Sequence, residues 1–415
     1  MFILLFFYLL VLGCRFWLLS LNLGYLKKHG ETVPPEFEGV IDPDRLGRIS
    51  AYTIEKSRIG IVESVISSAV TIIFFFGGIL GSYDRWIGSM SGSFLSGGLI
   101  FFLPLLYAEL LIDIPFSLYK NFRIEKKYGF NTMSLGLWAA DLVKSAVIST
   151  VLGATVLAGA LAIVRSSPAW WWLWVWTFFL AFGIFVMYLA PYVIEPLFFK
   201  FEPLRMEGLE DKVRELMERA GLKVSRVFQV DASRRSRHSN AYFTGIGRIK
   251  RIVLFDTLLT QMSHDEILAV LAHEIGHWKK RHVMKGIVLT ETLALIGLFI
   301  AYRLVSWEGL PALTGLPAAS FYARALILGF AGTLAAFPLT PLFAAVSRRY
   351  ESEADRFASA LTGPEELASS LVKLSSENLS NLHPHPLYAK FYYSHPPVVE
   401  RIRELKRQDG KKVGG

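Results

Sequence analysis

Two histidines four residues apart, His273 and His277, enclose the acid Glu274. In a helix this spacing places both imidazoles on one face, where together they can bind one zinc ion. Glu274 then lies beside the metal and can act on its water as a general base. Ser263 and Glu266 form a capping-box pattern that starts such a helix. The stretch therefore predicts the zinc site of a hydrolytic enzyme.

A catalytic zinc ion takes three protein ligands and keeps one position open. Far downstream, Glu351 and Asp355 share one helical face, whereas Glu353 lies about 200° round from Glu351. We assign Glu351 as the third ligand and expect Asp355 to accept a hydrogen bond from the distal nitrogen of a zinc histidine. The alternative is that these acids only pair with Arg348 and Arg349 at a membrane surface.

The composition indicates that these residues belong to a membrane protein. Of 415 residues, 53% are hydrophobic and only 19% are charged, whereas about 25% are charged in ordinary soluble proteins. The single cysteine, Cys14, excludes an internal disulfide and a cysteine-based zinc cluster. The net charge of +9 favours basic loops beside an anionic membrane surface, and we expect no nucleic-acid partner.

Seven apolar stretches have the length that a membrane-spanning helix needs, which is about 20 residues. They run from about Phe2 to Leu21, Ile59 to Leu80, Phe94 to Leu118, Leu135 to Val164, Trp170 to Pro191, Val283 to Tyr302 and Leu326 to Val346. Loops rich in lysine and arginine alternate with poor ones along the chain. The positive-inside rule then places the C-terminus and the zinc site on the cytoplasmic side, with the N-terminus outside.

Several ionisable residues interrupt these stretches. A charge in hydrocarbon is costly, so such groups should face a watery cavity or pair with one another. Asp141 and Lys144, one helical turn apart, could be such a pair. The two readings stay open for the whole set, which comprises Glu63, Glu109, Asp113, Asp141, Lys144 and Glu291.

Residues 192–282 break the apolar pattern and predict a small α+β unit. Apolar residues at helical spacing end at Gly221, and alternating patterns at 227–231, 240–244 and 251–255 predict strands, with a turn at Gly245 and Gly247 between the last two. The expected fold is thus mainly α, a seven-helix integral membrane protein with a small α+β zinc peptidase unit. We divide it into 1–191 (five spans), 192–282 (cytoplasmic unit with the zinc-binding helix), 283–350 (two spans) and 351–415 (cytoplasmic segment with the third ligand).

Four ordered motifs resemble those of the type I CaaX prenyl endopeptidases, which are integral-membrane zinc metallopeptidases. They are His238–Phe243, His273–His277, Ser347–Asp355 and Tyr393–Pro397. The resemblance implies a ring of seven helices that encloses a water-filled chamber, with one zinc ion inside at the cytosolic side. It also implies a peptide or protein substrate with a prenylated C-terminal Cys-aliphatic-aliphatic-any ending, from which the last three residues are removed. The membrane would be that of the endoplasmic reticulum in a eukaryote and the plasma membrane in a prokaryote.

The candidate catalytic residues are Glu274, Asp355 and His395. By resemblance, His395 donates a hydrogen bond to the oxyanion of the tetrahedral intermediate, and Arg401 supports the site. The segment Asn240, Ala241, Tyr242 and Phe243 is expected to form an edge strand to which an extended peptide adds, with His238 nearby. We treat the other histidines as ordinary polar residues, and expect His282 to face lipid headgroups.

Two other functions fit the same residues less closely. A membrane zinc protease without prenyl specificity could clear damaged membrane proteins; the shorter bacterial heat-shock proteases share both zinc motifs but have fewer spans before the soluble unit. A channel or transporter could carry a regulatory metal site. Glu274 argues against this last class, because a site that only binds metal needs no general base.

Overall fold

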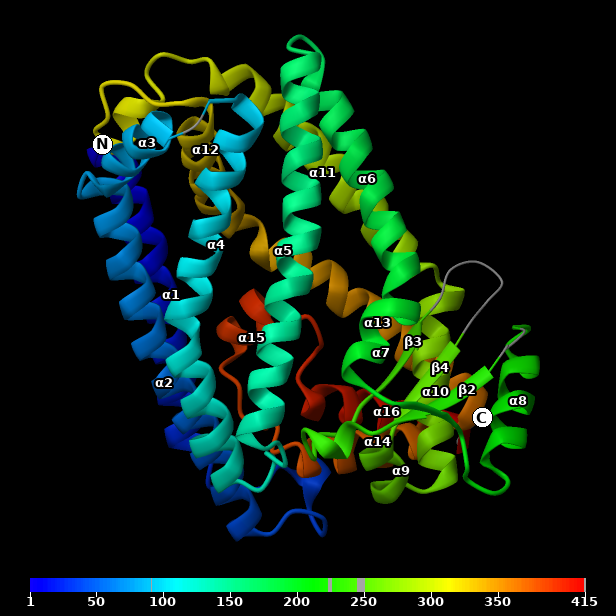
Figure 1. Cartoon of the computed structure of the whole chain (residues 1–415). Helices are drawn as coiled ribbons and strands as arrows, with labels where there is room; N and C mark the ends of the chain where they lie inside the picture. The colour runs from blue at the N-terminus through cyan, green and yellow to red at the C-terminus, as the bar shows by residue number, and fades with distance from the viewer. Residues whose placement is uncertain (91, 223–225, 245–250, 414–415) are drawn as a thin grey trace.

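A computed structural model describes residues 1–90, 92–222, 226–244 and 251–413. Helices dominate it, and one four-stranded sheet lies near one end (Figure 1). The expected turn at Gly245 and Gly247 lies outside the described residues. The N-terminus lies at the end opposite the sheet, whereas the C-terminus lies beside it (Figure 1).

Within the described part of the chain, seven helical segments are long and apolar enough to cross a membrane, which confirms the expected number. They are Phe2–His29, Pro43–Phe76, Phe94–Glu125, Leu135–Ser166, Trp171–Phe198, His282–Val305 and Phe321–Thr362. In Figure 1 they correspond to α1; α2; α4 (Phe94–Tyr119); α5; α6 (Trp171–Leu189) with α7 (Glu195–Phe198); α11; and α12 (Phe321–Ala336) with α13 (Thr340–Thr362). The shorter α3 (Ile79–Met90) lies between α2 and α4.

These spans bury little of their surface against one another. Only 0 to 17% of each apolar stretch is buried inside the protein, and for α11 the share is 0%. Seven helices packed into a solid bundle would bury more of their inner faces than these spans do. Glu109 and Asp113, one turn apart on α4, are exposed although they lie within a span. This arrangement agrees with the expected class of a seven-helix protein that encloses a chamber.

Other ionisable groups in the spans are paired. Arg235, from the segment after β2, donates to both oxygens of Asp141 at 2.8 and 3.1 Å, and Lys144 lies 3.4 Å from the same carboxylate. Lys120 binds Glu63 at 2.5 Å. Pairing therefore accounts for Glu63, Asp141 and Lys144. Glu109 and Asp113 are exposed instead, as expected for groups that face a watery cavity.

The α+β unit contains the sheet, whose order is β1-β2-β4-β3. Its strands are β1 (Phe201–Pro203), β2 (Arg226–Val230), β3 (Ala241–Thr244) and β4 (Arg251–Phe255). Strands β2 and β4 are parallel, with Val227 opposite Ile252, and the other two pairs are antiparallel. The remaining helices outside the spans are α8 (Leu209–Arg219), α9 (Asp256–Gln261), α10 (His264–Lys279), α14 (Pro364–Glu377), α15 (Pro386–Tyr392) and α16 (Val398–Val413). Of these, α15 lies away from the sheet and packs against α13 and α1.

The largest core of the molecule fixes α10, the helix of the two histidines. Ile267, Leu271 and Ile275 point from α10 into this core, where they meet Leu254 of β4 and Leu367 of α14, all nearly inaccessible to solvent. Burial of such side chains stabilises a fold by about 1.5–3 kcal/mol each. The helix that carries the site therefore belongs to the most firmly packed part of the protein.

The proposed division at residues 350 and 351 falls inside one continuous helix. Helix α13 runs from Thr340 to Thr362 without a break and ends before Gly363, whose φ is +104°. The last span therefore extends rigidly into the segment that carries Glu351. The division at residues 282 and 283 lies where α11 begins, and three helices, α14 to α16, occupy the C-terminal segment.

Candidate metal centre

The capping box at the start of α10 forms as the sequence predicts. The Ser263 hydroxyl accepts from the Glu266 amide at 3.3 Å, and the Glu266 carboxylate accepts from the Ser263 amide at 2.8 Å. Ser369 and Lys373 of α14 also donate to this carboxylate, at 2.6 and 2.7 Å. One acid thus caps α10 and fastens it to α14.

A glycine lets α10 and α13 approach closely enough to share a site. A Cβ atom at Gly276 would lie 2.9 Å from the Cα atom of Ala354 and 3.1 Å from its carbonyl oxygen. Real Cβ atoms do not approach backbone so closely, so a larger residue would push the helices apart. Gly276 lies one residue before His277, and Ala354 lies between Glu351 and Asp355. The close crossing therefore brings the histidines of α10 to the acids of α13.

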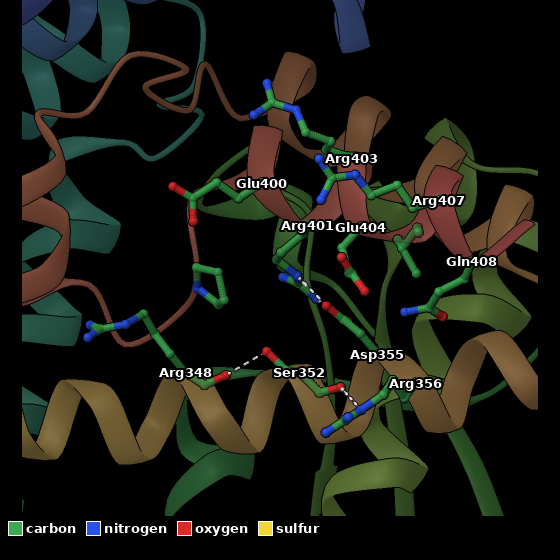
Figure 2. Close-up of a pocket in the computed structure, with 12 residues that line it drawn as sticks. Arg348, Ser352, Asp355, Arg356, Glu400, Arg401, Arg403, Glu404, Arg407 and Gln408 are labelled. Atoms are coloured by element: carbon green, nitrogen blue, oxygen red, sulfur yellow. Dashed lines mark hydrogen bonds and ion pairs between the residues drawn. The ribbon is translucent and has the colours of Figure 1, made fainter. Parts of the chain in front are cut away.

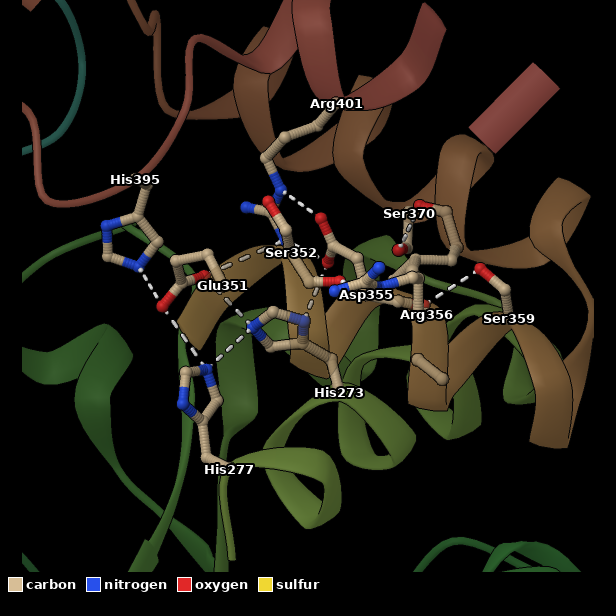
Figure 3. A network of polar contacts seen from close by, with 12 residues as sticks. His273, His277, Glu351, Ser352, Asp355, Arg356, Ser359, Ser370, His395 and Arg401 are labelled. Carbon is tan, nitrogen blue, oxygen red and sulfur yellow. Dashed lines mark hydrogen bonds and ion pairs between the residues drawn. The ribbon is translucent and has the colours of Figure 1, made fainter. Parts of the chain in front are cut away.

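The structure brings His273, His277 and Glu351 together (Figure 3). One ligand atom from each lies within 4.8 Å of the others. The Nε2 atoms of both histidines lie 3.2 Å from the Glu351 carboxylate and 3.1 Å from each other. His273 and Glu351 are buried, and the His277 side chain is 22% exposed.

These donors fit a metal ion. Glu351 Oε2 is buried, and among the described residues its nearest nitrogen, His273 Nε2 at 3.2 Å, does not form a well-aligned hydrogen bond with it. A buried carboxylate oxygen without a well-aligned donor is costly, and a bound cation would stabilise it. Two imidazole nitrogens and a carboxylate are also the mixed N and O donor set that divalent transition metals bind. A cation bound between His273, His277 and Glu351 would satisfy all of these groups.

Asp355 supports His273 from behind. Its Oδ1 atom lies 2.8 Å from His273 Nδ1, the nitrogen that faces away from the other candidate ligands. Burial alone lowers the pKa of His273, but the contacts with Asp355 and Glu351 outweigh it and raise the pKa to about 9. Without metal this imidazole therefore keeps its proton at neutral pH, and metal binding has to release that proton.

Arg401 of α16 holds Asp355 in turn (Figure 2). It donates from Nε at 2.8 Å and from Nη2 at 2.6 Å, and its side chain is only 11% exposed. Arg348, which the sequence offered as an alternative partner for these acids, donates to the backbone oxygens of Ala389 and Tyr393. Arg401 and Asp355 also form part of the wall of a pocket of about 590 Å³ between α13 and α16.

Glu274 and His395 lie next to this cluster. No hydrogen bond or ion pair connects the Glu274 carboxylate to another side chain of the described residues, and burial raises its pKa. His395 Nε2 lies 3.3 Å from Glu351, while its Nδ1 contacts the Ser394 hydroxyl at 2.9 Å. Burial lowers the pKa of His395, although its side chain is still 59% exposed.

The expected peptide-binding segment lies at the edge of the sheet. Strand β3 contains Ala241, Tyr242 and Phe243 and pairs with β4, and no other described strand adjoins it. Asn240 precedes the strand, and its backbone oxygen accepts from Phe255 of β4 at 3.1 Å. The Tyr242 hydroxyl donates to Glu195 at 3.0 Å. The outer edge of β3 therefore has the geometry that strand addition requires.

His238 is occupied elsewhere. Its ring stacks on Phe130 at 3.9 Å, and its two nitrogens contact Asn378 and Glu125 at 3.1 and 3.2 Å. These partners come from the α4–α5 connection, from η2 (Lys120–Glu125) and from the end of α14, so the residue joins the spans to the soluble unit. A contact between His238 and the substrate remains a prediction.

His282 is buried at the metal centre, and the prediction that it faces lipid headgroups is wrong. The residue does not face headgroups: it is 5% exposed and stacks on Tyr350 of α13, with ring centroids 4.3 Å apart. Its Nδ1 atom lies 3.1 Å from His277 Nδ1, and its Nε2 atom lies 3.2 Å from Glu353. The physical reason is a reversal at Arg281, which has a φ of +56° and turns the start of α11 back onto α10.

The chain is similar to membrane peptidases of known family. Residues 22–200 match a family model described as the CAAX prenyl protease N-terminal region with five membrane helices, and residues 203–409 match peptidase family M48. A CAAX prenyl protease 1 homolog of Arabidopsis thaliana is 34% identical, over 92% of each chain. The CAAX prenyl protease 1 of Saccharomyces cerevisiae is 33% identical, over 94% of this chain and 91% of that one.

A solved structure agrees in fold. The crystal structure of S. mikatae Ste24p superimposes with a TM-score of 0.86 at 30% identity, and the match covers 97% of this chain and 98% of the other. The resemblance deduced from the four motifs is therefore confirmed. The chain belongs to peptidase family M48 and is an integral, multi-pass membrane metallopeptidase with the N-terminal helical region of the CAAX prenyl proteases.

Proposed function

We propose that this protein is a zinc endopeptidase that removes the C-terminal tripeptide from prenylated proteins with a Cys-aliphatic-aliphatic-any ending. The observation that carries the proposal is the convergence of His273, His277 and Glu351 on one point, with the unpaired carboxylate of Glu274 beside it. The names of the relatives support the substrate class. The chamber suits such a substrate, because an isoprenoid chain there need not be fully hydrated.

We assign zinc because two histidines and one glutamate are the ligands of a common class of zinc peptidase sites. When bound, zinc would polarise the scissile carbonyl and make the attacking water more acidic. The chain supplies the remaining chemistry. Asp355 keeps the His273 ring oriented so that Nε2 faces Glu351 and His277, and Arg401 keeps Asp355 in place.

Glu274 acts as the general base. Its carboxylate accepts the proton of the attacking water and later delivers it to the leaving amine. Burial supports this role, because a raised pKa makes the carboxylate a better proton acceptor. His395 donates a hydrogen bond to the oxyanion that develops on the substrate carbonyl, and its exposure leaves it free to turn toward the peptide.

The substrate adds to the sheet as a further strand. The backbone of Asn240, Ala241, Tyr242 and Phe243 offers hydrogen bonds to an extended peptide, and His238 fixes the loop that precedes it. Main-chain bonding of this kind holds the peptide in register whatever its side chains are. It therefore suits an enzyme whose two aliphatic positions vary.

The site faces the cytoplasm. The loop before α2, the connection from α4 to α5, the α+β unit and the C-terminus all lie at one end of the molecule (Figure 1). These are the segments rich in lysine and arginine, which favours a cytoplasmic position. The membrane is that of the endoplasmic reticulum in a eukaryote and the plasma membrane in a prokaryote.

A cleavage assay with matched peptides tests the proposal. The purified full chain receives a farnesylated C-terminal peptide or its unprenylated twin, with and without a metal chelator. We expect release of the tripeptide from the farnesylated peptide, loss of cleavage with chelator and recovery with zinc. Glu274→Gln should keep its zinc and lose cleavage, because the amide cannot accept the water proton.

Equal cleavage of both peptides would replace prenyl specificity with a general membrane quality-control protease. Cleavage at the wild-type rate by metal-loaded Glu274→Gln would remove the peptidase mechanism itself.

A further inference from the structure

His282 connects the metal centre to a second acid. The reversal at Arg281 places its ring between His277 of α10 and Glu353 of α13. Stacking on Tyr350, with 9° between the ring planes, fixes the plane of the imidazole. On the far side of Glu353, Arg349 donates to the other carboxylate oxygen at 3.2 Å.

The protons along this chain of contacts have one consistent arrangement. His277 Nε2 faces Glu351 and His273, so it must be free of a proton when it binds a metal. A neutral imidazole then carries its proton on Nδ1. That N–H points at His282 Nδ1, 3.1 Å away, which must be an unprotonated acceptor.

His282 and Glu353 form the next hydrogen bond outward from the metal centre. If His282 Nδ1 accepts, the neutral His282 ring carries its proton on Nε2. That N–H donates to Glu353 Oε2 at 3.2 Å, a carboxylate oxygen that can only accept. The orientation of each hydrogen bond is therefore set by its neighbour, from the metal side to the acid.

We propose that His282 is a positioning residue of the metal centre, which accepts a hydrogen bond from His277 Nδ1 and so fixes the tautomer and the ring orientation in which His277 Nε2 binds the metal. This inference rests on the proposed function, because it takes His277 as a ligand. Partners behind a metal-binding histidine typically change metal affinity about 10–100-fold when they are removed.

Packing is the rival explanation, since His282 is buried and stacked. Two substitutions separate the possibilities. His282→Phe keeps an aromatic ring against Tyr350 but cannot accept a hydrogen bond. His282→Asn loses the ring but places an amide oxygen near the position of Nδ1, so it can accept from His277.

The experiment is a zinc titration of the full-length protein in detergent, in competition with a chelating dye, together with the absorption spectrum of the cobalt-loaded form. His282→Phe should bind zinc about 10–100-fold more weakly and change the cobalt spectrum. His282→Asn should recover most of the affinity. His264→Phe, the same substitution at the start of α10, is the matched control and should bind zinc like the wild type.

Wild-type affinity and spectrum in His282→Phe would overturn the proposal, and so would an equal loss in the Phe and Asn variants, which would indicate packing. If His282→Phe does not fold, the zinc affinity of Glu353→Leu tests the proposal instead, because this substitution removes the acceptor of His282 without changing either imidazole ring. An unchanged zinc affinity in Glu353→Leu would also overturn the proposal. A wild-type protein that binds no zinc would instead contradict the proposed function.

Discussion

His273 lies directly against a carboxylate, whereas His277 reaches one through a second imidazole. Behind His273, Asp355 is bound by Arg401, whose side chain is 11% exposed and donates twice. Behind His277, His282 leads to Glu353, which accepts from Arg349, a side chain that is 79% exposed. Both supports end in an arginine, but one lies in the interior and the other at the surface.

This difference indicates how much each support contributes. A charged pair in the interior has no solvent to replace a missing partner, so removing one member leaves an uncompensated charge. An exposed pair loses little, since water takes the place of the missing group. The His273 side should therefore be the more sensitive to charge removal, and the His277 side should depend on its imidazole rather than on its terminal arginine.

The largest effect is expected where the two sides meet. Glu351→Ala removes a side chain that contacts both histidines, so neither support can compensate for it. We expect zinc content well below one ion per chain and loss of cleavage, because two histidines alone do not complete a catalytic zinc site. Elemental analysis of the purified variant checks this. Unchanged zinc content would mean that another acid, Glu353 or Asp355, is the third ligand.

The second largest effect is expected at Arg401, the arginine in the interior. Arg401→Met leaves Asp355 buried without its bidentate partner, which should cost about 3 kcal/mol of stability. The orientation of His273 should suffer as well, with a loss of zinc affinity of about 10-fold or more. Thermal unfolding in detergent and zinc titration measure the two consequences.

The matched control is the surface arginine. Arg349→Met removes the corresponding terminal charge on the His277 side, and its effect on stability should stay within about 1 kcal/mol. Equal effects of the two substitutions would contradict the contrast between an interior and a surface support.

Features set by local pattern could be predicted from the sequence. The seven spans follow from apolar length, and the start of α10 follows from the spacing of Ser263 and Glu266. The shared face of His273 and His277 follows from helical geometry alone. The distant Glu351 could be chosen because a catalytic zinc site needs a third ligand, which left a small number of acids to consider.

Features set by tertiary contact could not be predicted in this way. Gly276 reads as an ordinary helix glycine until Ala354 of another helix is placed against it. His282 follows three basic residues, so the pattern favoured an exposed position; only the left-handed turn at Arg281 shows that it folds back under His277. His282 does lie five residues after His277, and a histidine so close to a zinc motif is the one signal that could have identified it.

We expect His273, His277 and Glu351 to bind one catalytic metal ion. Anomalous diffraction from crystals of the purified protein, collected at the zinc absorption edge, tests it most directly. We predict one anomalous peak per chain, at bonding distance from the Nε2 atoms of both histidines and from a Glu351 oxygen. No peak there after soaking with zinc, or a peak bound by other residues, would contradict the account.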